Sequence, residues 1–284
     1  MNAAAARRVD RPGPLVLVMV AVAWLLVVIG LPLATVVVQA LAKGLGVFFG
    51  TFRQPDAVAA IRLTLLAAAI AVPLNAAARP KAAAWSIAKF EFRGKSLLIT
   101  LIDLPLSMSP VISGLVWVLL LGARGWFGPV LAAAGVKVIF AVPGIVLATI
   151  LVTVPLIARE LIPLMIEQGT EEELAATTLG AGGWSVFFRV TLPNVRWALL
   201  HGVLLCNARA MGEFGAVSVL SGHIRGVTET LPLHIEALYN DYDFAGAFSA
   251  ASLLAGLAIV TLIAKTALER AGAVNPSSRG FHAP

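Results

Sequence analysis

Long runs of apolar residues without a single charge dominate this sequence and limit what the chain can fold into. A helix that crosses a bilayer needs about 20 consecutive, mostly apolar residues. Four runs free of Asp, Glu, Lys and Arg meet that length, at 15–42, 104–123, 138–158 and 244–264. Hydrophobic residues make up 59% of the chain, against about 45–50% in soluble domains. The sequence therefore predicts an all-α integral membrane protein.

Two further apolar segments are interrupted by charges. One combines 57–61 with 63–78, separated by Arg62, and the other is 197–224, which contains Arg209 and Glu213. Together these give about six transmembrane helices. The sequence Arg79-Pro80-Lys81 either ends the second span near Ala78 or kinks it into a cytoplasmic helix. We favour an end, because proline removes a helix hydrogen bond and cations at bilayer depth are costly.

Lys and Arg set the orientation, because they collect on the cytoplasmic side of membrane proteins. With the N-terminus inside, 14 of the 21 lie on the cytoplasmic side and six outside, and Arg209 lies within a span. The bias predicts an N-in, C-in topology, and it explains the net charge of +6 without nucleic acid.

The first apolar run is too long for a signal peptide core of 7–15 residues and indicates an uncleaved anchor. The predicted parts are a cytoplasmic tail (1–14), the first helix with an outer loop (15–56), a core of five helices (57–268) and a second cytoplasmic tail (269–284).

The cytoplasmic loop at 169–193 carries the most specific signal. Thr170 and Glu173 have capping-box spacing, so a helix is expected to begin there. Gly180, Gly182 and Gly183 are expected to end it, before a second short helix that stops at Pro193. Small residues on the first helix would let another protein approach its backbone. On chemistry alone, the loop could equally be a connector between two spans.

The spacing of this loop resembles the EAA loop of permease subunits in ABC importers. Ala175, Ala176, Gly180 and the later apolar positions are in register, whereas Leu174 stands at the glutamate position, directly after Glu171–Glu173. The resemblance implies a coupling helix that sits on a separate ATPase subunit. The residues that would carry the coupling are Glu173, Leu174, Ala175, Ala176, Gly180, Val190, Leu192 and Pro193. The chain itself is not expected to hydrolyse ATP, because Gly94-Lys95-Ser96 lacks the first P-loop glycine, where Lys89 stands.

Residues 207–217 resemble the fifth-span signature of sulfate and molybdate permeases. Residues 218–226 and 230–236, and 92–96 continuing to 109–111, resemble the sulfate branch more specifically. The similarity covers about 61–269 and is closest to W-type permeases of sulfate/thiosulfate importers. It implies a type I ABC importer permease in a bacterial inner membrane. The implied partners are a homologous permease, two ATPase subunits that use ATP, and a periplasmic sulfate-binding protein.

Other functions are less well supported. Molybdate or tungstate import is the nearest alternative, because these ions are also tetrahedral oxyanions. A secondary transporter is disfavoured by the small number of spans and the lack of an inverted repeat. A membrane enzyme is disfavoured because no catalytic carboxylate pair, metal cluster or nucleophile–base pair is visible in the sequence. No cofactor or metal is expected on this chain.

Two pairs of residues four positions apart are candidates for the translocation pathway. Arg209 and Glu213 are expected to share a helix face, either as an ion pair that locks the helix or with Arg209 lowering the barrier for a dianion. Ser109 and Ser113 either bind sulfate oxygens or bond back to their own helix carbonyls. Several other polar residues are assigned to packing, to an interface or to docking of a binding protein; these are His201 and Cys206 (packing), Asp103 (interface), and His223, His234, Glu236, Asp241 and Asp243 (docking).

Overall fold

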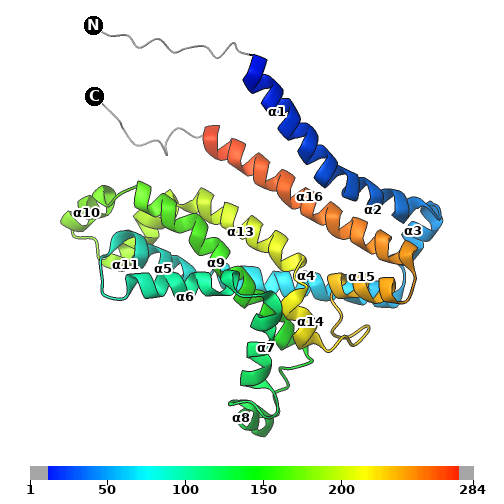
Figure 1. Cartoon of the computed structure of the whole chain (residues 1–284). Helices are drawn as coiled ribbons and strands as arrows, with labels where there is room; N and C mark the ends of the chain where they lie inside the picture. Colours follow the sequence, from blue (N-terminus) through cyan, green and yellow to red (C-terminus); the bar gives the residue numbers. More distant parts are fainter. Residues whose placement is uncertain (1–11, 275–284) are drawn as a thin grey trace.

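Prolines mark where many of the helices begin in a computed structural model, which describes residues 12–274. Proline fits the first helical turn because its missing N–H has no partner there. It stands in the first turn of α2, α4, α7, α8, α9, α12 and α15. The described residues form helices and no strands, so the all-α prediction is confirmed (Figure 1).

The helices in chain order are α1 (Pro12–Leu25), η1 (a π-helix, Leu26–Gly30), α2 (Leu31–Leu41), α3 (Leu45–Thr51), α4 (Pro55–Ala76), α5 (Ala78–Lys89), α6 (Lys95–Ser107), α7 (Pro110–Leu121), α8 (Gly128–Ala133), α9 (Val142–Glu167), α10 (Glu171–Thr178), α11 (Gly183–Val186), η2 (a π-helix, Phe187–Thr191), α12 (Leu192–Asn194), α13 (Arg196–Met211), α14 (Gly215–Ser221), α15 (Leu231–Asn240) and α16 (Phe244–Val274). Most of the predicted tails, 1–11 and 275–284, lies outside the described residues. Residues 12–14 and 269–274, which were also predicted as tail, belong to α1 and α16.

Four helical segments among residues 12–274 are each long and apolar enough to cross a membrane. They are Val16–Leu41, Pro55–Ala76, Val142–Glu167 and Phe244–Leu268. Two further pairs meet the same criterion but are bent, by 107° between α6 and α7 and by 52° between α13 and α14. The described chain therefore has four to six spans, depending on whether each bent pair counts as one.

The predicted third span, 104–123, is not one continuous helix. Met108 and Ser109 have extended backbone, with ψ of 150° and 134°, and they separate α6 from α7. Pro110 has no N–H to carry the hydrogen-bond ladder across this break. The second span ends at Ala76, close to the predicted Ala78, but the chain does not leave helix there. After the single extended residue Ala77 it turns and continues as helix α5, which contains Arg79-Pro80-Lys81, as the kinked alternative expected.

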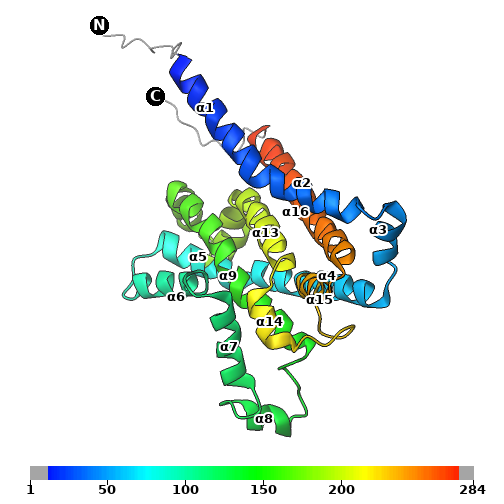
Figure 2. The ribbon, with the colours of Figure 1, turned by 45° about the vertical axis from the view of Figure 1, so that its right-hand side comes forward.

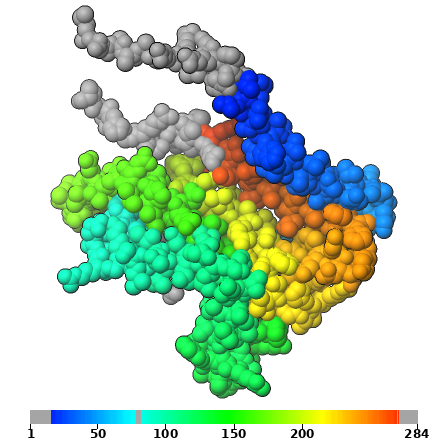
Figure 3. Space-filling model, in the orientation of Figure 1, coloured from blue at the N-terminus to red at the C-terminus, as the bar shows by residue number. Residues whose placement is uncertain are grey.

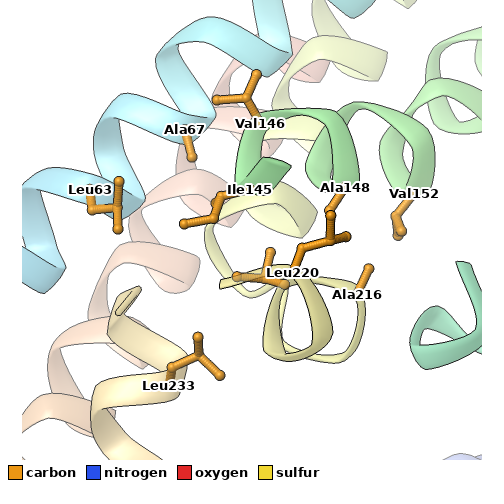
Figure 4. Close-up of a cluster of buried hydrophobic side chains, with 10 residues drawn as sticks. Leu63, Ala67, Ile145, Val146, Ala148, Val152, Ala216, Leu220 and Leu233 are labelled. Atoms are coloured by element: carbon orange, nitrogen blue, oxygen red, sulfur yellow. The ribbon is translucent and has the colours of Figure 1, made fainter. Parts of the chain in front are cut away.

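The long helix α9 is the centre of the fold. It runs beyond the predicted 138–158, and it packs against α4, α5, α6, α7, α13 and α14. Within α9, the hydroxyls of Thr149 and Thr153 donate to carbonyls one turn earlier. Ile145 and Val152 of α9 meet Leu63 of α4, Leu220 of α14 and Leu233 of α15 in a buried apolar cluster (Figure 4).

The first helix extends away from this core. Helix α2 packs against α16, whereas α1 extends beyond it (Figures 1 and 2). The most apolar window of Val16–Leu41 has no buried residue, as expected of a helix that faces lipid. Helices α7 and α8 project from the other side of the molecule (Figure 3).

The loop helix α10 lies at one end of the molecule. In Figure 1, α16 ends towards the left, where α10 also lies, while α3 and α15 lie on the right. The predicted topology requires α10 and the end of α16 to share a side. Which side faces the cytoplasm stays a prediction from the distribution of Lys and Arg.

Candidate functional site: the coupling loop and two broken spans

Helix α10 begins where the sequence predicted, at Glu171, but without the predicted capping box. The Thr170 side chain makes no capping hydrogen bond. The carboxylate of Glu173, which would complete the box, is engaged with other elements instead. The helix still begins there because Glu171, Glu172 and Glu173 fill its first turn, where negative charge suits the helix dipole.

Polar contacts from this first turn attach α10 to the rest of the molecule. Glu172 accepts a hydrogen bond from Nδ2 of Asn194. Glu173 accepts one from the hydroxyl of Thr191 at 2.8 Å, and its other oxygen lies 3.0 Å from Nζ of Lys89. Lys89 also donates to the carbonyl of Gly169. Glu173 therefore joins α5, α10 and η2.

The second half of the loop is helical from Gly183 to Asn194, through α11, η2 and α12. The predicted end at Pro193 falls one residue short. Val190 and Leu192 are partly buried and Pro193 is exposed. Phe187 packs edge-on against Trp85 of α5, with ring centroids 5.4 Å apart, so this half of the loop also rests on α5.

Large apolar side chains of the loop face outward. Leu179 is 89% exposed and Leu174 is 61% exposed, and Trp184 and Phe188 are also exposed. We call these four residues the apolar loop face. Gly180 lies beside it with φ of +88° and open space where a side chain would be. Ala175 is exposed and Ala176 half-buried, so the backbone here is accessible to another protein.

Arg209 and Glu213 form an ion pair, but not along one continuous helix face as predicted. Helix α13 ends at Met211, and Glu213 lies in the non-helical break before α14. Nη1 of Arg209 lies 2.9 Å from Oε2 of Glu213, whose side chain is 1% exposed. The other Glu213 oxygen accepts the backbone N–H of Ala216 at 3.0 Å. Glu213 thus caps α14 while it pairs with Arg209.

Ser109 and Ser113 do not form the pair of hydroxyls on one helix face that the sequence predicted. Ser109 lies in the break before α7 and is exposed, whereas Ser113 is buried. The Ser113 hydroxyl donates to the Ser109 carbonyl at 3.4 Å. Ser113 therefore follows the back-bonding alternative, because a buried hydroxyl needs a partner and its own helix supplies one.

The two broken spans meet at their breaks. A Cβ atom on Gly215, at the start of α14, would lie 2.8 Å from Cβ of Pro110, at the start of α7. A Cβ on Gly114 would lie 2.7 Å from the carbonyl oxygen of Ala216. Glycine at both positions therefore allows the backbones of α7 and α14 to touch. This contact brings the break that holds Ser109 next to the break that holds Glu213.

Sequence reasoning missed several polar links between helices. Nδ2 of Asn75 in α4 donates to the hydroxyl of Thr153 at 2.7 Å and lies 3.8 Å from Sγ of Cys206. His201, predicted as a packing residue, lies 2.8 Å from Glu160 of α9. Asp103 pairs with Arg159 of α9 at 2.8 Å, and its role at an interface stays a prediction. A lone polar residue in an apolar run signals such a link, but not its partner.

The loop between α14 and α15 and the end of α15 surround a polar pocket of about 280 Å³. Arg225 pairs there with Asp241, and this hydrogen bond and charge raise the pKa of Arg225 above its usual value. His234 is buried, with Nδ1 3.6 Å from Glu229, so its predicted place on a docking surface is wrong. Asp243 accepts the N–H of Gly246 and thereby caps α16.

Comparisons with known proteins agree with this geometry. Residues 82–272 match the family described as binding-protein-dependent transport system inner membrane component. The chain is 50% identical over 256 residues to the sulfate transport system permease protein CysW of Synechococcus elongatus, covering 90% of this chain and 89% of the relative. It is 33% identical to the sulfate transport system permease protein CysT of Escherichia coli, covering 84% and 86%. A crystal structure of a bacterial alginate ABC transporter shares the fold, with a TM-score of 0.74 at 17% identity, covering 90% of this chain and 93% of that one.

Proposed function

The chain belongs to the family of binding-protein-dependent transport system inner membrane components, and we propose that it is the permease subunit of an ATP-driven sulfate importer. The observation that supports sulfate as the substrate is the 50% identity to a sulfate permease, over about nine tenths of both chains. In this role the chain forms a passage for the ion in a bacterial inner membrane and catalyses no reaction itself.

The apolar loop face supports an ATPase subunit as the partner of α10. Exposed apolar clusters on a polar loop mark protein interaction sites. Covering one large apolar side chain contributes about 1.5–3 kcal/mol, so Leu174, Leu179 and Trp184 provide enough surface for a stable contact. In the first turn of α10, Glu172 and Glu173 are engaged within the chain, and the exposed Glu171 is available for basic groups of the partner.

The meeting of the two breaks supports a translocation pathway at α7 and α14. Non-helical backbone at membrane depth is tolerated where it is buried in protein or lines a polar passage, and transporters place substrate sites at such interrupted helices. Arg209 is 37% exposed although its partner Glu213 is buried. It therefore offers part of its guanidinium to a passing dianion while Glu213 limits how tightly that dianion is held. Ser109, exposed in the neighbouring break, offers a hydroxyl.

The remaining partners follow from this role. The similarity to CysT-type permeases supports a homologous permease as the second half of the pathway. Two ATPase subunits bind and hydrolyse ATP, and this chain binds no cofactor. A periplasmic binding protein delivers sulfate or thiosulfate to the side opposite α10, and lipid covers the exposed first helix.

Competition for uptake tests the substrate. Cells that lack their own sulfate importer receive the complete complex, and uptake of labelled sulfate is measured with excess thiosulfate, molybdate or tungstate. We expect unlabelled sulfate and thiosulfate to compete more strongly than molybdate. Stronger competition by molybdate or tungstate than by sulfate would assign the chain to molybdate or tungstate import instead.

A further inference from the structure

Helix α10 is attached to the molecule in an unusual way. None of its residues is buried, although most protein helices are held by packing of an apolar face. Leu174 of α10 and Leu179, which directly follows it, face outward. The contacts that hold α10 are instead the hydrogen bonds and the ion pair of Glu172 and Glu173.

The charged end of one of these contacts, Lys89, has a largely buried side chain. Its side chain is 5% exposed, and that of Glu173 is 14% exposed. Nζ of Lys89 reaches both the Glu173 carboxylate and the carbonyl of Gly169, the residue that leads into α10. The ammonium therefore holds the backbone just before α10 and a side chain in its first turn at the same time.

Lys89 also connects α10 to the membrane-spanning core. It is the last residue of α5, which packs along α9 and directly follows the second span. Thr191 of η2 holds the other oxygen of the same carboxylate. A displacement of α10 is therefore passed to α5 through the contact between Lys89 and Glu173, and to η2 through Thr191.

We propose that Lys89 and Glu173 are positioning residues that transmit the movement of the coupling loop to the spans through α5. The inference rests on the proposed function, in which α10 docks on an ATPase. Docking itself uses the apolar loop face, which Lys89 does not join. Loss of the pair therefore separates ATP hydrolysis from transport and leaves attachment of the ATPase intact.

The test uses the complete importer in proteoliposomes, with binding protein and labelled sulfate. ATP hydrolysed per sulfate imported is measured for Lys89→Met, Glu173→Gln, Lys89→Arg and the exchanged pair Lys89→Glu with Glu173→Lys. Co-purification of the ATPase is measured for each. Lys95→Met is the matched control, because Lys95 pairs with the exposed Glu91 at 2.6 Å one turn away on the surface, and such pairs contribute little. Leu179→Asp tests docking separately.

We expect about tenfold more ATP hydrolysed per sulfate in Lys89→Met and Glu173→Gln, within the usual range of coupling between sites. The ATPase stays bound, Lys89→Arg restores the ratio, the exchanged pair restores part of it, and Lys95→Met does not change it.

If Lys89→Met keeps the wild-type ratio while Leu179→Asp releases the ATPase, the positioning role is wrong and the docking role stands. If Lys89→Met itself releases the ATPase, the pair is only structural. If Leu179→Asp also leaves the ATPase bound and transport normal, the proposed function of the loop fails.

Discussion

Arg209 reaches across the break between α13 and α14 to the buried carboxylate of Glu213, with Nη1 2.9 Å from Oε2. Because Glu213 also caps α14, the pair holds the bent fifth span in shape. The Arg209 side chain is nevertheless 37% exposed. A structural role and a role in transport are therefore both open to Arg209, and they can be separated by removing one charge or both.

Arg209→Met is expected to abolish sulfate uptake and to destabilise the subunit, because an uncompensated buried carboxylate costs about 3–5 kcal/mol. The double variant Arg209→Met with Glu213→Gln removes both charges and is expected to regain stability without transport. Thermal unfolding in detergent and uptake of labelled sulfate provide the two measurements. Near-normal uptake by the double variant would mean that the pair serves the fold alone.

Gly180→Val is expected to weaken attachment of the ATPase. Gly180 has φ of +88°, and a side chain in that conformation costs about 1–2 kcal/mol, which corresponds to about 5–30-fold in affinity. Gly182→Val is the matched control, because Gly182 has φ of −71° and equally open surroundings. Affinity for the ATPase is measured on the purified permease pair. Equal effects of the two substitutions would rule out a special role for the Gly180 backbone.

Asn75→Ala is expected to lower stability rather than transport. Its amide links α4 to α9 through Thr153, and hydrogen bonds between membrane helices contribute about 0.6–1.7 kcal/mol. A decrease in Tm of about 2–4 °C per kcal/mol follows for a chain of this size. Thr266→Ala is the control, since the Thr266 hydroxyl bonds to the carbonyl of Leu262 in its own helix. A decrease in Tm as large for the control as for Asn75→Ala would contradict the link.

Asp241→Lys is expected to weaken stimulation by the binding protein. It breaks the pair with Arg225 and reverses one charge at the rim of the outer pocket. Charges at an interface rim act mainly on association rate and salt dependence. The concentration of binding protein that gives half-maximal ATP hydrolysis should rise several-fold at low salt, and the difference should shrink at high salt. No change at low salt would remove this pocket from the docking surface.

The sequence predicted most of the spans and the helices of the loop at 169–193, because both depend on local patterns. The lengths of the apolar runs indicated where the membrane helices lie, and the acidic turn at Glu171–Glu173 indicated where α10 begins. The breaks at Ser109 and Glu213 were not predicted from the sequence. The hydropathy of an apolar run is the same whether its helix is straight or bent, even by 107°.

The contacts between distant residues could not be predicted from one sequence. Glu173 fits a capping box by spacing, yet it bonds to Thr191 and Lys89, 18 and 84 positions away. His234 was predicted at the surface because it lies in a polar loop, but the fold buries it against Glu229. In both cases the partner was decided by how helices pack, which spacing along the chain does not specify.

Import of labelled sulfate into proteoliposomes that hold the complete complex tests most directly whether this chain couples sulfate movement to a separate ATPase. The measurement compares wild type with Leu179→Asp, with ATP on the side of α10 and binding protein on the other. We predict ATP-dependent accumulation by the wild type, none without the ATPase subunits, and a large loss in Leu179→Asp. Sulfate accumulation that persists without the ATPase subunits, or that is unaffected by Leu179→Asp, would contradict the proposed coupling.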